Sequence, residues 1–497
     1  MSFIRSAAVT SAASLVSMLL GAVTAKIIAV MAGPSGIAVF SQLRQAGQFV
    51  TLFATLNGQN SLVRGIAARE GKSRHDYAFT IGAVFLLGVA LVGCAFLLLA
   101  PQAGELLFPD GAPALRQTVY LVAPLALLGA LASYYQGVLN GLRLIQALAL
   151  SQVGAAVAAA LVAYPCIEAN HPAGYVVIVA TGFATSVLLS ARALRREGWR
   201  VGGLLPPGAL GTGWDNSAMR EHLPFAAVTL VTGLSGAAMV IAIRTLYIHE
   251  GGLELGGIFD AVWTISMMYV MLLLSSFGAH YLPTLSGAKT PEDIQHSVSS
   301  VFRVAALFGT PLVCTAIVFK PWLVRLLYSQ DFASAVELLR WTMLGDYLKI
   351  SGWVFGMLLI ARAERRLFAL SELAWQITVL GAVALFLHHS HETAGMAYLA
   401  ANAAYLLFAW QHARHDHGVR IDAQSFQIWL AGLAMVSLLS LLAWQDRTAP
   451  SPGALAVYAV LLPAFFFLAT TREQRAWLVA SLRKLATPGP EARGGGD

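Results

Sequence analysis

Residues 77–100 read YAFTIGAVFLLGVALVGCAFLLLA and contain no Asp, Glu, Lys or Arg. A helix needs roughly 20 consecutive apolar residues to cross the hydrocarbon of a bilayer, so this stretch predicts a membrane-spanning helix. Similar stretches recur along the whole chain. They predict an all-α, polytopic membrane protein with about fourteen spanning segments, at 7–31, 36–58, 77–100, 117–138, 144–164, 173–191, 223–247, 256–281, 299–319, 335–360, 367–387, 394–411, 426–444 and 453–470.

The overall composition agrees with this interpretation. Of the 497 residues, 57% are hydrophobic and 11% are charged, whereas soluble domains average about 25% charged residues. The net charge of +7 would indicate a nucleic-acid partner only on a soluble domain with a basic face, and here Lys and Arg lie in short loops between apolar stretches. The sequence therefore predicts contact with membrane lipid and no nucleic-acid partner. The first apolar stretch contains Lys26 and is longer than a signal peptide core, so no cleaved signal is expected.

Loop charges alternate along the chain and predict its orientation. Cytoplasmic loops of membrane proteins are enriched in Lys and Arg, which predicts that the N- and C-termini lie in the cytoplasm. Lys320 and Arg325 are the one clear exception. The basic loops contain Arg64, Arg69, Lys72, Arg74, Arg143, Arg192, Arg195, Arg196, Arg200, Arg362, Arg365, Arg366, Arg414 and Arg420, and the opposite loops contain Glu105, Asp110, Glu168, Glu250, Glu254 and Glu392.

An internal repeat at an offset of roughly 220 residues indicates two similar halves, as many transporters have. Leu106-Leu107-Phe108 corresponds to Leu326-Leu327-Tyr328, and Arg143 corresponds to Arg362. The predicted organisation is an N-terminal lobe at 1–191, a cytoplasmic linker at 192–222, a C-terminal lobe at 223–415, two further helices at 424–472 and a cytoplasmic tail at 473–497.

Charged side chains inside predicted spanning segments are the main candidates for function. A charge in hydrocarbon costs several kcal/mol on insertion scales, so such residues face a cavity or a partner. Four of the six are cationic, an excess that suits an anionic ligand. The six are Lys26, Arg44, Arg244, Asp260, Asp346 and Lys349.

The second segment carries a polar stripe in which Arg44, Gln45 and Gln48 recur with Ser41 and Thr51 at helical spacing. Guanidinium and amide groups bind phosphate oxygens and sugar hydroxyls, so the stripe is a candidate substrate surface. Hydrogen bonds between neighbouring helices are the alternative explanation. The two explanations are equally weighted for the glutamines, and the cavity is favoured for Arg44.

The other intramembrane charges allow two interpretations each. Asp346 and Lys349 lie three residues apart and can pair on one helix, or Asp346 can serve as a proton or sodium site coupled to transport. Arg244 has no acid three or four residues away, which favours a role as a substrate cation, with Asp260 on the next segment as a possible partner.

The sequence shows no signature of an enzyme or of a cofactor site. A P-loop, a GxSxG elbow and a carboxylate pair in a soluble domain are all missing, and the histidines at 388–391 and 412–417 match no common metal spacing. We therefore expect a transporter without a cofactor or a metal.

Three stretches resemble Wzx-type flippases for O-antigen and enterobacterial common antigen. They are AKIIAVMAGPSGIAVFSQLRQ at 25–45, GGIFDAVWTISMMYVMLLLSSFGAHYLPTLS at 256–286, and 326–369, which begins LLYSQDF and contains WTMLGDYLKISGWVFGMLLIARAERRLF. The resemblance spans residues 1 to about 415, and its two motifs in the second half are specific.

This resemblance implies the fold of the multidrug/oligosaccharidyl-lipid/polysaccharide superfamily, in which two six-helix lobes form a V around a central cavity. It implies an undecaprenyl-pyrophosphate-linked glycan as substrate, flipped by alternating access from the cytoplasmic to the periplasmic leaflet of a bacterial inner membrane. It further implies a polysaccharide polymerase and a chain-length regulator as partners, and we expect a monomer. By the same resemblance Arg244, Asp346 and Lys349 correspond to functional positions of the family. The last two predicted helices are an addition to that pattern.

Two other transport functions and one non-transport function compete with this prediction. A lipid II-type flippase or a multidrug antiporter belongs to the same superfamily, but an antiporter of organic cations is expected to have an excess of acidic cavity residues. A membrane glycan polymerase or glycosyltransferase needs a large periplasmic loop with catalytic residues, and the longest outer loops predicted here have only about 15 residues.

Overall fold

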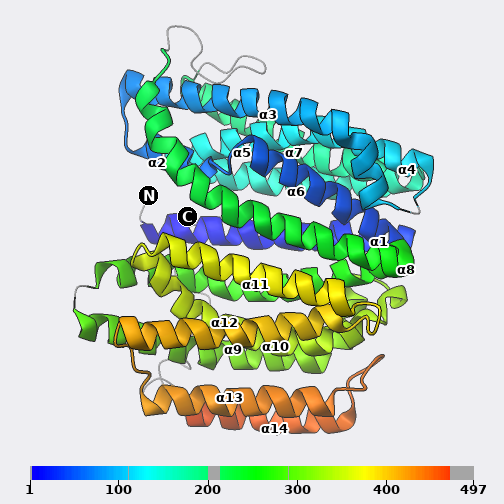
Figure 1. The fold of residues 1–497 in the computed structure, drawn as a ribbon, viewed down its shortest axis with the longest axis vertical. Coiled ribbons are helices and arrows are strands. Elements are labelled where there is room, and N and C mark those ends of the chain that lie inside the picture. Colours follow the sequence, from blue (N-terminus) through cyan, green and yellow to red (C-terminus); the bar gives the residue numbers. More distant parts are fainter. Residues whose placement is uncertain (1–2, 110, 200–212, 289, 471–497) are drawn as a thin grey trace, which may run out of the picture. The chain divides into compact units, whose positions relative to one another are not determined.

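The computed structural model describes residues 3–109, 111–199, 213–288 and 290–470 (Figure 1). In these residues every regular element is a helix, and none is a strand. Eleven of the described helices are long and apolar enough to cross a membrane. The prediction of an all-α membrane protein is therefore confirmed. Residues 200–212 of the predicted linker and the predicted tail at 473–497 lie outside the described residues.

Two very long helices each contain two of the predicted segments. Helix α1 spans Phe3–Ala54 and has a non-helical residue at Gly33, where φ is 63°, directly before Pro34. Helix α8 spans Asn216–Gly287 and is interrupted at Gly252, where φ is 72°. Glycine adopts positive φ without steric cost, so each pair of predicted segments is joined through a sharp bend rather than a loop. The structure thus keeps four predicted segments in two continuous elements.

The remaining helices follow the predicted segments with two additions. The short helices α2 and α4 were not predicted, because neither is long enough to produce a spanning pattern. The segment predicted at 394–411 lies in α12, which is a helix but is not among the eleven apolar ones. The bounds are α2 Gln59–Ala67, α3 Gly71–Leu107, α4 Pro113–Gln117, η1 Thr118–Leu121, α5 Val122–Gly141, α6 Ile145–Glu168, α7 Ala173–Arg196, α9 Pro291–Leu327, η2 Gln330–Phe332, α10 Ala335–Ala361, α11 Arg365–Phe386, α12 Thr393–Asp416, α13 Ala423–Leu442 and α14 Pro452–Ala469.

The helix boundaries themselves repeat along the chain. Helices α3 and α9 begin and end 220 residues apart, and so do α7 and α12. The starts of α6 and α11 show the same offset, and each is preceded by a residue with positive φ, Arg143 at 59° and Ala363 at 58°. The bends at Gly33 and Gly252 differ by 219 residues. Both halves of the sequence therefore encode the same local helix plan.

By packing, the described residues fall into two compact units. The first lies within Met1–Met268, Trp322–Thr342 and Ala363–Ala401, and the second lies within Tyr269–Pro321, Met343–Arg362 and Asn402–Asp497. These units are defined by packing, whereas the predicted lobes were defined by the repeat. The predicted lobe boundaries at 191 and 223 therefore stay a prediction.

Small residues allow helices of the first unit to approach closely. A Cβ atom added to Gly154 of α6 would lie 2.4 Å from the side chain of Leu189 in α7, and these two helices pack along their length (Figure 1). Without a hydrophobic driving force between helices in lipid, such close contact is a main source of helix association.

In the second unit, Lys320 explains an exception to the loop charges. It is 1% exposed, and its Nζ donates a hydrogen bond to the carbonyl of Ala443, directly after the last residue of α13. A cation at a helix C-terminus satisfies unpaired carbonyl groups and the negative end of the helix dipole. Lys320 is therefore a buried helix cap rather than a loop charge that sets topology.

Helix α8 touches the bend of α1 through a glycine. A Cβ atom added to Gly257 would lie 1.8 Å from the carbonyl oxygen of Pro34. Because that oxygen belongs to the backbone, the two helices would have to separate to accommodate any side chain here.

We predict that Gly257→Ala destabilises the protein by about 1–3 kcal/mol, the usual range for overpacking. The melting temperature of the purified protein in detergent measures this effect. Gly381→Ala is the matched control, because a Cβ atom at Gly381 meets no atom within 4 Å. Equal melting temperatures for the two variants would contradict a tight α1–α8 contact.

Candidate functional site

The second part of α1 and the middle of α8 hold a buried polar network in the first unit. One Nη of Arg244 donates to the carboxylate of Asp260, forming an ion pair. Its other Nη donates to the Oε1 of Gln42 at 3.1 Å. Ser41 donates its hydroxyl hydrogen to the second carboxylate oxygen of Asp260. The network therefore joins α1 to both parts of α8.

Every member of this network is withdrawn from solvent. Arg244 is 1% exposed, and Asp260 is 3% exposed. The amide of Gln42 donates in turn to the hydroxyl of Thr245 at 2.8 Å. An unpaired buried charge is strongly unfavourable, and the acid beside Arg244 removes that cost. Asp260 is thus the partner of Arg244, one of the two interpretations that the sequence allowed. The charge of Arg244 is neutralised in this structure.

Arg44 lies on the same part of α1 but is held differently. It is half-buried and lies over the ring of Phe40, 5.4 Å from the centroid. Its Nε is buried without a hydrogen-bond partner, and its guanidinium forms no ion pair with another described residue. Arg244 and Tyr328 are its electrostatic neighbours. The carboxylate of Asp260 neutralises Arg244. The group formed by Arg44, Arg244 and Asp260 therefore carries one net positive charge, which lies on Arg44.

The ammonium group of Lys26 donates to backbone carbonyls rather than to an acidic side chain. Its Nζ donates to the carbonyl of Arg325 at 2.8 Å and to the carbonyl of Tyr328. These carbonyls lie at the C-terminal end of α9, where unpaired acceptors and the helix dipole favour a cation. In this structure Lys26 therefore acts as a helix cap, and its role toward a substrate stays a prediction.

The two glutamines of the predicted stripe lie near Arg44 in sequence. Gln45 is half-buried and Gln48 is exposed. Neither has a side-chain hydrogen bond to another described residue. Their amides are therefore open to a ligand or to water, which is what a substrate surface requires.

Asp346 and Lys349 belong to α10, in the second unit. Asp346 is fully buried and accepts a hydrogen bond from the hydroxyl of Tyr269. Lys349 is half-buried, and both residues have further interactions. The structure thus supplies a buried carboxylate with a phenol donor, and its use in ion coupling stays a prediction.

Sequence reasoning missed four participants, Gln42, Thr245, Tyr269 and Tyr328. Gln42 was passed over because it lies beside the polar stripe, although an amide in a spanning segment is itself a signal of an interhelical hydrogen bond. Tyr269 and Tyr328 gave no signal, because tyrosine is common in membrane segments and its partners are distant in sequence.

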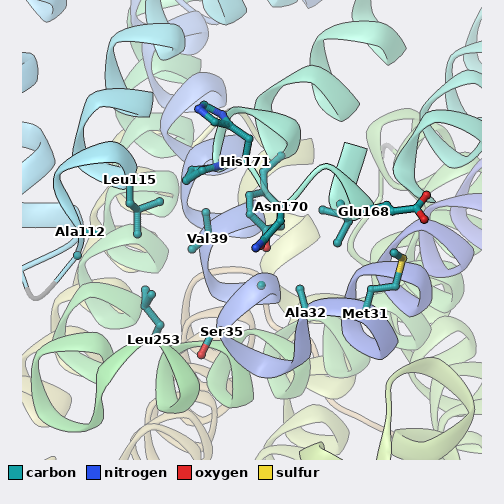
Figure 2. A pocket seen from close by; sticks show the side chains of 15 residues that line it. Met31, Ala32, Ser35, Val39, Ala112, Leu115, Glu168, Asn170, His171 and Leu253 are labelled. Atoms are coloured by element: carbon teal, nitrogen blue, oxygen red, sulfur yellow. The ribbon is translucent and has the colours of Figure 1, made fainter. Parts of the chain in front are cut away.

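The first unit also contains a pocket of about 730 Å³ at one end of its helices. Four connections line it: the α1 bend, the α3–α4 and α6–α7 loops, and the α8 bend. Figure 2 shows Asn170 near the middle, with Ser35 and Leu253 below it, Leu115 to one side and Glu168 at the edge. The loop charges predict that all four connections lie on the periplasmic side of the membrane.

The chemistry of this pocket differs from that of the buried network. Among the described residues that line it, the polar side chains are hydroxyl, amide, imidazole and carboxylate groups, and none is Lys or Arg. Tyr175 adds an aromatic ring and a hydroxyl. Such a set suits a neutral, hydroxyl-rich ligand and does not suit a phosphate group.

Comparison with known proteins gives a family and a fold. The family described as "Polysaccharide biosynthesis protein" matches residues 3–289. The chain is 28% identical over 417 residues to the Lipid III flippase of Escherichia coli (strain K12), an alignment that covers 82% of this chain and 96% of that relative.

Two solved structures show the same fold at low sequence identity. The lipid II flippase MurJ in an inward closed conformation has a TM-score of 0.67 and 10% identity, covering 93% of this chain and 98% of MurJ. An inward-facing multidrug resistance MATE family transporter of the MOP superfamily has a TM-score of 0.66 and 14% identity, covering 81% of this chain and 94% of that transporter. The superfamily fold implied by the sequence resemblance is therefore confirmed.

We predict that Arg244→Gln and Asp260→Asn each destabilise the protein by about 3–5 kcal/mol, because each leaves a buried charge unpaired. The double variant should lose much less stability than the sum of the losses of the two single variants. Melting temperatures of the three variants in detergent measure this coupling. Additive losses would show that the two groups do not pair in the membrane.

Proposed function

Because this chain belongs to the family of polysaccharide biosynthesis proteins, we propose that it is a flippase for a lipid-linked oligosaccharide. The substrate is an undecaprenyl-pyrophosphate-linked glycan, which the protein moves from the cytoplasmic to the periplasmic leaflet for surface polysaccharide assembly. The relative named as a lipid III flippase supports this class of substrate over a small soluble one.

The observation that carries the proposal is the uncompensated charge of Arg44. It is half-buried in a spanning helix, beside a neutralised Arg244–Asp260 pair, without an acid of its own among the described residues. A guanidinium binds phosphate oxygens through charge-assisted, bidentate hydrogen bonds. Arg44 therefore binds the pyrophosphate, and Arg244 with Asp260 fixes the helices around it.

The other predicted residues take supporting roles in this proposal. Gln45 and Gln48 donate to phosphate or sugar oxygens next to Arg44. Lys26 and Lys349 supply further positive charge when the helices rearrange. Asp346 is the ion-coupling candidate, because a buried carboxylate beside a tyrosine hydroxyl can exchange a proton or bind a cation.

Alternating access between two lobes moves the glycan. The lobes are 1–191 and 223–415, joined by the linker 192–222, with helices 424–472 and the tail 473–497 following them. The repeated helix plan supports this division. With both termini in the cytoplasm, the inside-negative potential assists outward movement of the anion by about 2.3 kcal/mol per charge per 100 mV.

The Asn170 pocket receives the glycan on the periplasmic side. Ser35 of this pocket and Arg44 lie nine residues apart on α1, about 14 Å along a helix of 1.5 Å rise per residue. That separation suits a ligand with a phosphate group at one end and sugars at the other. A polymerase and a chain-length regulator then use the glycan at this face, and the flippase works as a monomer.

Two other transport functions are less well supported. Export of organic cations requires an acidic cavity, whereas the excess charge at Arg44 is positive. Lipid II transport shares the phosphate chemistry, and the fold of MurJ covers more of this chain than the fold of the MATE transporter does. Lipid II is therefore the second candidate substrate.

Transport in proteoliposomes tests the function. The vesicles contain undecaprenyl-pyrophosphate-linked oligosaccharide, and a membrane-impermeant glycosidase reports the glycan that reaches the outer leaflet. The same assay with lipid II distinguishes the second candidate. If the protein moves the oligosaccharide no faster than protein-free vesicles do, the proposal is wrong.

For Arg44→Gln we predict a rate about 10- to 100-fold lower, because a hydrogen bond to a charged group contributes about 1.5–3 kcal/mol. Arg44→Lys keeps the charge but cannot form bidentate hydrogen bonds. Its transport rate should lie between the rates of Arg44→Gln and the wild type. Arg414→Gln, at an exposed arginine, is the control. Wild-type rates for Arg44→Gln would remove Arg44 from the mechanism.

For Ala112→Trp we predict a transport rate at least several-fold lower, since an indole at this lining position occupies the space for sugar. Ala449→Trp is the control, because Ala449 is exposed in the connection between α13 and α14, which does not line the pocket. The measurement is the same glycosidase assay. An equal effect of both substitutions would argue against a glycan site here.

A further inference from the structure

A second pocket lies at the opposite end of the α6–α7 pair. Its volume is about 610 Å³, and it is lined by the first residues of α6, the last turns of α7 and the connection before α6. Helices of 24 residues separate it from the Asn170 pocket by about 36 Å, at 1.5 Å per residue. The two pockets therefore lie at opposite ends of spanning helices.

Three guanidinium groups converge on this second pocket. Arg143, Arg192 and Arg196 line it together with a single acid, Glu197, so the lining carries an excess of two positive charges. None of the three arginines forms an ion pair or a side-chain hydrogen bond with another described residue. Their donors are available to a ligand.

The backbone also favours a specific placement of Arg143. Its φ is 59°, a left-handed conformation that is uncommon for a residue other than glycine. The bend before α6 thus places a charged side chain at the pocket, whereas the corresponding residue with positive φ in the second half, Ala363, carries no charge.

Besides the charged residues and Gln146, the lining has an apolar part. It comprises Leu144, Ile145, Ala147, Leu150, Leu189 and Ala193. Leu150 is 62% exposed although it belongs to a spanning helix, as expected of a side chain in contact with lipid. The pocket combines phosphate-binding groups with a surface for hydrocarbon.

Topology alone accounts for the presence of arginines at this end of α7, because cytoplasmic loops are enriched in them. It does not account for three arginines around one cavity without an acidic partner for each. Basic pockets between helices on the cytoplasmic side are suited to anionic lipid head groups.

We propose that this pocket binds the phosphate groups of a membrane lipid in the cytoplasmic leaflet. The three guanidinium groups hold the phosphate oxygens, and the lipid chains lie along Leu150 and its neighbours. A polyprenyl diphosphate and an anionic phospholipid share this chemistry. The assignment to the cytoplasmic leaflet rests on the orientation in the proposed function, whereas the lipid-phosphate chemistry rests on the pocket itself.

Native mass spectrometry of the purified protein with added lipid tests the proposal. The probes are cardiolipin, phosphatidylglycerol, undecaprenyl diphosphate and, as a neutral reference, phosphatidylcholine. The triple variant Arg143→Gln, Arg192→Gln and Arg196→Gln is compared with a triple variant of exposed arginines outside the pocket, Arg220→Gln, Arg366→Gln and Arg414→Gln. Melting temperatures establish that both variants are folded.

The pocket variant should bind anionic lipid about 10- to 100-fold more weakly, at about 1 kcal/mol for each arginine lost, and the control variant should bind like the wild type. Tighter binding of undecaprenyl diphosphate than of cardiolipin identifies a loading site for the substrate carrier, and the reverse order identifies a phospholipid site; both support the proposal. Equal binding by the two triple variants, or binding of phosphatidylcholine as tight as that of the anionic lipids, overturns it. This readout is independent of transport, so a failed flipping assay leaves it intact.

Discussion

A guanidinium buried among membrane helices requires an acid beside it, and the Arg244–Asp260 pair meets this constraint. The pair lies across the bend of α8, and through Gln42 and Ser41 it also engages α1. Because removal of either partner strands a charge in a medium of low dielectric, the relative positions of these segments are tightly restrained. The proposed substrate contact at Arg44 depends on this restraint, since Arg44 is a separate charge only while Asp260 is committed to Arg244.

The same logic distinguishes cations that build the fold from cations that remain available. Lys26 and Lys320 both donate to carbonyls at the ends of helices, where the helix dipole favours positive charge. Arg44 has no such partner among the described residues, and neither do the three arginines of the second pocket. Intramembrane charge by itself therefore does not identify a binding residue. The unused hydrogen-bonding capacity of the side chain is the better guide.

The α6–α7 pair connects two chemically different environments in the first unit. One end has hydroxyl, amide and carboxylate groups around Asn170, and the other has guanidinium groups and leucines. A lipid-linked glycan has the same division between sugars and a phosphorylated lipid. Both pockets lie where bends and loops interrupt or join helices, at the ends of closely packed spans.

Much of the architecture is determined by the sequence alone, because hydrocarbon accepts only helices whose backbone is internally bonded. Apolar length and loop charge therefore predicted the spanning segments, and the 220-residue repeat anticipated helix boundaries such as those of α3 and α9. Only the tertiary structure decided which charges are paired: Asp260 is 16 residues from Arg244, and Tyr328 is 302 residues from Lys26. Helical periodicity reaches only a few residues along the chain, so partners on other helices are fixed by packing.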